Sequence, residues 1–156
     1  MTTSTLALGD ADIDREIGDR CRVYQEAFGF NASRYYRPGV IGMTAGRVAA
    51  VIVPRTLGVR VRDLLAERSI SVPIFSVDHD MWVFLTEAPA DRDDTDHITI
   101  EMFKYGVLVL HNGALIALPT PGVSRRCWFG LPDGHRRTLF VTVTDAVVAV
   151  ADRTRT

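Results

Sequence analysis

The chain has 156 residues and a formal net charge of -1 at pH 7, from 18 basic and 19 acidic side chains. Hydrophobic residues make up 47% and charged residues 24%, a globular composition that excludes disordered, collagenous and coiled-coil chains. The balanced charge excludes the global basic field that dominates non-specific nucleic-acid binding. We therefore expect one domain that folds without disulfides.

The cysteines and the apolar runs indicate the compartment. Cys21 and Cys127 form neither a C-x-x-C pair nor a disulfide framework. The N-terminal residues include acidic side chains and lack the apolar run of a secretion signal. Every apolar run is far shorter than the ~20 residues of a membrane span. These features predict a cytoplasmic protein that makes no contact with membranes.

The N-terminal region predicts a disordered tail over residues 1–11, followed by a helix that begins at Asp12 and stops at Gly29. Within this helix, apolar residues recur at spacings of four, four, three and four, which is the stripe of an amphipathic helix. They are Ile13, Ile17, Cys21, Tyr24 and Phe28.

The middle of the chain alternates short β-type runs with helical patterns, separated by Gly and Pro. Strands are predicted over residues 32–36, 40–44, 48–53, 72–77 and 81–86, and a helix capped by Thr56 over residues 57–68. The run 48–53 is apolar at every position, as in a strand that is buried on both faces.

The last third predicts two turns and two helices. Asp96 caps a short helix that ends at Lys104, and Asn112-Gly113 joins strands 107–110 and 114–118 as a hairpin. Strands 127–131 and 138–143 flank a turn at residues 132–134, and Thr144 and Asp145 cap a final helix to Arg153, for which a strand is a rival interpretation. The predicted fold is a single α+β domain over residues 12–156. Its mixed or antiparallel sheet, with β-hairpins, packs against three to four helices.

One set of features, from about Arg47 to Leu131, resembles the bifunctional DNA primase–polymerase domain of the archaeo-eukaryotic primase superfamily. Val51-Ile52-Val53-Pro54 resembles the strand that carries Asp-x-Asp before Pro in that family. Met81-Trp82-Val83-Phe84 resembles the strand with the nucleotide-binding His, and residues 106–110 the strand with a third acidic residue. Residues 118–122 and Trp128-Phe129 fit the Pro-rich loop and aromatic segment that follow.

The resemblance implies a scaffold without its catalytic apparatus. Nucleotidyl transfer in this family uses divalent metal held by carboxylates. The matching positions hold Val51, Val53 and Leu108, whose side chains cannot bind a hard cation, and Trp82 stands in place of the His. The resemblance therefore implies no cofactor and a binding or regulatory role.

A second reading is a small enzyme with a metal or acid/base site. Asp78, His79 and Asp80 place two carboxylates around an imidazole, and His135 is a further candidate member. In an extended segment, however, the two Asp side chains point to one side and His79 to the other. The pattern therefore favours a polar turn between two strands.

Arginine is the one residue type with local clusters that suggest a binding surface. Guanidinium groups pair with phosphates, so a converging set would bind a nucleic-acid backbone. The candidates are Arg60, Arg62, Arg125, Arg126, Arg136 and Arg137. A solvated face is the competing interpretation, and the net charge favours it.

We therefore expect a non-catalytic binding domain. Its partner would be another protein, a second copy of the chain or, with weak affinity, a nucleic acid. Trp82, Trp128 and Phe129 are interpreted either as interface anchors or as core residues.

Overall fold

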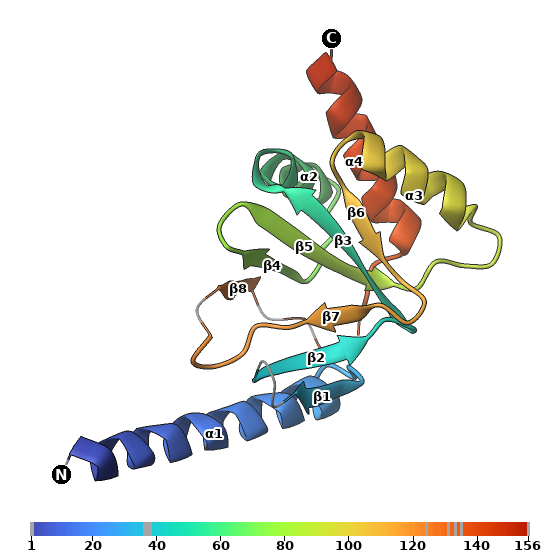
Figure 1. Cartoon of the computed structure of the whole chain (residues 1–156). Coiled ribbons are helices and arrows are strands. Elements are labelled where there is room, and N and C mark those ends of the chain that lie inside the picture. The colour runs from blue at the N-terminus through green and yellow to red at the C-terminus, as the bar shows by residue number, and fades with distance from the viewer. Residues whose placement is uncertain are drawn as a thin grey trace.

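The computed structural model describes residues 2–35, 39–123, 125–130, 132, 134 and 136–155 (Figure 1). Within these ranges, the chain forms four helices and eight strands. In chain order they are α1 (Thr2–Glu26), β1 (Ala32–Tyr35), β2 (Val40–Thr44), β3 (Val48–Pro54), α2 (Arg55–Glu67), β4 (Ile74–Val77), β5 (Met81–Glu87), α3 (Thr95–Lys104), β6 (Leu108–Leu110), β7 (Leu115–Ala117), β8 (Arg126–Gly130) and α4 (Phe140–Arg155). Among these residues, no helix is long and apolar enough to cross a membrane.

The strands form two antiparallel sheets, which confirms the predicted α+β class. A three-stranded sheet has the order β1-β2-β7, and a five-stranded sheet has the order β6-β3-β5-β4-β8. The longest pairing joins β3 to β5, from Val48 opposite Glu87 to Pro54 opposite Met81. β3 is apolar along its length and lies between β6 and β5, so it is an interior strand of the sheet.

Both faces of the five-stranded sheet are covered by other elements of the chain. Successive side chains of each strand alternate between these two faces. Val51 and Val53 point to the face on which α2, α3 and α4 pack, and both are fully buried. Ala50 and Val83 point to the opposite face, which the three-stranded sheet and α1 cover (Figure 1). The two faces give the molecule two apolar cores.

Helix α1 begins earlier than the sequence predicts. Its backbone is helical from Thr2, so the start at Asp12 is wrong, and the stretch over residues 1–11 that was predicted to be disordered is helical from Thr2 onward. Between those positions the chain contains no Pro to interrupt a helix. The amphipathic stripe is confirmed for Ile17, Cys21 and Tyr24, which are at most 8% exposed, but not for Ile13, which is 42% exposed. The helix ends at Glu26, before the predicted stop at Gly29, so the buried Phe28 follows the helix.

The Asn112-Gly113 turn exists, but the predicted hairpin is wrong. Both residues have positive φ, +51° and +92°, as the sequence pattern requires. The strands on either side, however, belong to different sheets, because β6 pairs with β3 and β7 pairs with β2. The Gly113 amide donates to the carbonyl of Ala45 at 2.8 Å, so the turn is hydrogen-bonded to the loop that connects β2 of the three-stranded sheet to β3 of the five-stranded sheet.

Helix α4 replaces the predicted strand over residues 138–143. Phe140, Val143 and Val147 recur at helical spacing, and each is at most 1% exposed, so burial of this stripe overrides the β-propensity of the Val and Thr residues. Thr144 and Asp145 therefore lie inside the helix and do not cap it. The other two predicted caps are wrong too: Pro54 precedes α2 in place of Thr56, and Asp94 caps α3 in place of Asp96.

Candidate functional site

Asp78, His79 and Asp80, the candidate residues of a metal or acid/base site, form the turn between β4 and β5. Asp78 and His79 have φ of +53° and +68°, and all three residues are exposed. The Asp78 carboxylate accepts a hydrogen bond from Arg125 Nε at 2.8 Å, which raises the Arg125 pKa. His135 lies outside the described residues. Among those described, no three His, Cys, Asp or Glu side chains gather to hold a metal ion. The turn interpretation is confirmed.

The six candidate arginines do not converge on one surface. Arg125 lies by Asp78, at the end of the sheet where β5 begins, whereas Arg137 lies by Glu87, where β5 ends. Six residues of extended strand separate these ends by ~20 Å. Arg60 and Arg62 lie on α2, Arg126 begins β8, and Arg136 is exposed in the segment before α4.

Arg137 has a structural role. Its guanidinium donates hydrogen bonds of 3.0 Å to the carbonyl oxygens of both Phe28 and Gly29, and it lies 5.5 Å from the centre of the Phe30 ring. Burial lowers its pKa. These contacts hold the segment that follows α1 against the rest of the molecule.

Val51, Val53 and Leu108, which the sequence resemblance compares with metal-binding acids, lie on two faces of the sheet. Val51 and Val53 face the helices. Leu108 pairs directly with Ile52, so its side chain is on the opposite face, where it is 46% exposed. Trp82 pairs with Val53 and is 4% exposed. Val109, which pairs with Val51, is therefore the β6 residue on the helical face.

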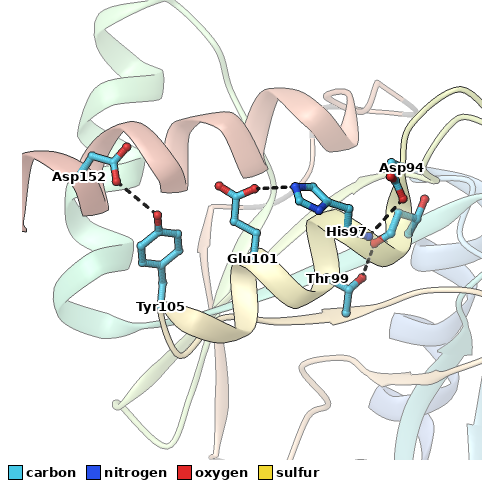
Figure 2. Close-up of polar contacts among 7 residues, drawn as sticks. Asp94, His97, Thr99, Glu101, Tyr105 and Asp152 are labelled. Atoms are coloured by element: carbon cyan, nitrogen blue, oxygen red, sulfur yellow. Dashed lines mark hydrogen bonds and ion pairs between the residues drawn. The ribbon is translucent and has the colours of Figure 1, made fainter.

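Helix α3 presents a surface for which the sequence pattern predicts no role. The helix is fixed at its start by Asp94, whose carboxylate accepts from the His97 amide at 3.2 Å. Beyond its end, the Tyr105 hydroxyl donates to Asp152 of α4 at 3.3 Å (Figure 2). Ile98 and Met102 pack into the core beneath the helix. These contacts fix which side of α3 faces away from the protein.

That side carries two apolar side chains. Ile100 is 63% exposed and Phe103 is 70% exposed, the highest values among the large hydrophobic residues whose burial is described. They are three residues apart and so are neighbours on the helix surface. Asp96 and Lys104, both exposed, lie on the same side. We call Asp96, His97, Ile100, Phe103 and Lys104 the outer face of α3.

The sequence holds one signal for this surface. Apolar residues at 98, 100, 102 and 103 occupy more of the helix circumference than one buried stripe requires. Some of them must therefore face outward when the helix packs on one side only.

Comparisons with protein-family models, curated proteins and solved structures found no match to this chain.

Proposed function

We propose that this protein is a non-catalytic binding domain that works as a homodimer, assembled through the outer face of α3. The observation that carries the proposal is the exposure of Ile100 and Phe103 next to each other on one helix. Single exposed apolar residues are common, but an adjacent pair on a well-fixed helix is typical of an interaction surface.

The charges of this face favour a second copy of the chain as the partner. A twofold interface uses the same patch on both subunits, so the patch must complement itself. Asp96 and Lys104 are each four residues from Ile100, or ~6 Å along the helix axis. When two α3 helices lie antiparallel with the twofold axis at Ile100, Asp96 of each subunit lies level with Lys104 of the partner subunit. The two Ile100 and two Phe103 side chains then lie between these ion pairs.

The non-catalytic part of the proposal is supported by what fills the matched positions. Val51 and Val53 are core residues, and Val109, which shares their face, is apolar as well. None of these side chains can hold a divalent cation. The resemblance to the primase–polymerase family therefore fits a scaffold that has lost its metal ligands and keeps a binding role.

Sedimentation equilibrium between 5 and 500 μM tests the dimer. We expect a monomer–dimer equilibrium that Phe103→Ser shifts toward the monomer. Leu139→Ser is the matched control, because Leu139 is 53% exposed and lies outside α3. A protein that stays monomeric at 500 μM would overturn the dimer, as would equal effects of the two substitutions.

Primer extension tests the non-catalytic part. With magnesium or manganese, nucleotides and a primed template, we expect the pure protein to incorporate nothing. Template-dependent incorporation that copurifies with the protein and is lost in Asp78→Asn or His79→Ala would overturn this part and support an enzymatic site at the turn.

A further inference from the structure

A cavity of about 430 Å³ lies where the second half of α2 meets β4 and the edge strand β8. Its volume falls within the range of sites for small molecules. Its walls are mostly apolar and include Leu65, Ile70, Val72 and Ile74. Arg62 and Phe129 also line it, and they supply the features that identify a ligand class.

Phe129 offers an aromatic surface that is supported from behind. Its ring centre lies 4.2 Å from that of Trp82, and Trp82 is 4% exposed. Gly58 of α2 packs against the same indole, since a Cβ at this position would lie 3.1 Å from a ring carbon. Phe129 itself is 49% exposed, so one part of its ring is held while another part faces solvent and the cavity. A planar ligand can stack on such a ring.

Arg62 places a positive charge beside this aromatic surface. Its guanidinium lies 5.0 Å from the centre of the Trp82 ring, and its side chain is 44% exposed. Its nearest ion partner is the neighbouring Asp63, at 3.8 Å from Nε, which is beyond hydrogen-bond distance. In the part of the chain that the structure describes, the donors of this guanidinium make no hydrogen bond, so they are available to a bound anion.

We propose that this cavity binds a planar aromatic ligand that carries an anionic group. The ring lies against Phe129 and the apolar walls, and the anionic group accepts hydrogen bonds from the Arg62 guanidinium. Arginine suits this role because its planar fork of donors pairs with a carboxylate in a bidentate way. The site is separate from the outer face of α3, so it does not depend on the dimer.

Three probes separate the parts of this proposal. Naphthalene-2-carboxylate has both features, 2-naphthalenemethanol lacks the charge, and cyclohexanecarboxylate lacks the aromatic ring. Because the site is small and open, we expect the naphthoate to bind with a dissociation constant of about 1 mM or below. The alcohol should bind about tenfold more weakly, since it cannot form charge-assisted hydrogen bonds. Calorimetry and quenching of tryptophan fluorescence provide the readouts.

Two arginines on the same helix give a matched pair of variants. Arg62→Gln should lower the naphthoate affinity about tenfold, to that of the alcohol, and leave the affinity for the alcohol unchanged. Arg60→Gln should change neither, because Arg60 lines a separate hollow with Val150 of α4. Equal binding of the naphthoate and the alcohol to the unmodified protein would overturn the role of Arg62 without any variant. Equal binding of the two carboxylates would overturn the aromatic requirement, and equal losses in the two variants would overturn the location.

Discussion

Reversing the two charges on the outer face of α3 tests the antiparallel arrangement directly. In the proposed dimer, Asp96 and Lys104 form two symmetric ion pairs, each between an exposed carboxylate and an exposed ammonium group. Lys104→Glu turns both attractive pairs into repulsive ones, and Asp96→Lys does the same. The double variant D96K/K104E restores two attractive pairs with the charges exchanged. We expect each single reversal to weaken the dimer and the double reversal to recover it.

The size of the effect follows from exposure. An exposed ion pair contributes ~0.2–1 kcal/mol, and like charges destabilise by similar amounts. Each pair loses an attraction and gains a repulsion, so with two pairs per dimer a single reversal should cost about 1–4 kcal/mol, which is a ~5- to 900-fold rise in the dimer dissociation constant. Raising the salt concentration from 0.02 to 0.5 M should reduce this difference, because screening shortens the range of exposed charges to a few ångströms.

Sedimentation equilibrium at both salt concentrations measures the dissociation constants, and circular dichroism checks that each variant is folded. The check matters because Asp96 lies in the first turn of α3 and Lys104 in the last, where both signs suit the helix dipole, so each reversal costs the helix ~0.3–1 kcal/mol. Folded single variants that dimerise as tightly as the unmodified protein would refute the arrangement. A double variant no tighter than the singles would refute the antiparallel register.

Two further predictions concern stability. Burial raises the pKa of Tyr24, whose hydroxyl donates to the Pro119 carbonyl and accepts from Trp128 Nε1 at 2.9 Å. The stability that these hydrogen bonds contribute is complete below the unfolded pKa of ~10 and is lost as pH rises through the higher folded pKa. Tyr24→Phe should therefore lower the free energy of unfolding by about 1–2 kcal/mol at pH 7 and remove part of its decrease between pH 7 and 11, as measured by urea titrations. Gly113→Ala should lower the free energy of unfolding by ~1–2 kcal/mol, because φ is +92° at this position. Gly46→Ala should be close to neutral, because a Cβ there also meets no atom within 4 Å and Gly46 has no positive φ. Equal melting temperatures of the two variants would contradict this reason.

The strands and helices that the sequence predicts well are those defined by local pattern. β2, β3 and β5 lie within one residue of their predicted ends, because alternation, apolar runs and Gly or Pro breaks are all encoded within a few residues. The partners of β6 and β7, which are β3 and β2, are not encoded in this way. The turn between these two strands contacts a distant part of the chain, since the Gly113 amide donates to the carbonyl of Ala45, 68 positions earlier. α4 shows the same limit, since its valines become helical only because the sheet is there to bury them.

The outer face of α3 and the cavity beside Phe129 likewise depend on contacts between distant parts of the chain, which a local sequence pattern does not specify. The sequence predicts a helix ending at Lys104, yet it does not show that Ile98 faces the core while Ile100 faces solvent. That choice depends on where α4 lies, which a local pattern cannot specify. Arg62, Trp82 and Phe129 each stand out in the sequence as single residues. They gather around one cavity because β8 pairs with β4, from which it is far separated in the chain.

The placement of α4 has a consequence for how the chain is made. Val51, Val53 and Phe84 belong to strands near the middle of the sequence, yet the helix that covers them together with α2 and α3 follows all eight strands in chain order. While a ribosome is still adding residues after β8, one face of the five-stranded sheet therefore lacks much of its cover. Such an exposed apolar face can bind chaperones or aggregate. The finished sheet thus depends on residues 140–150 leaving the ribosome before other chains reach it.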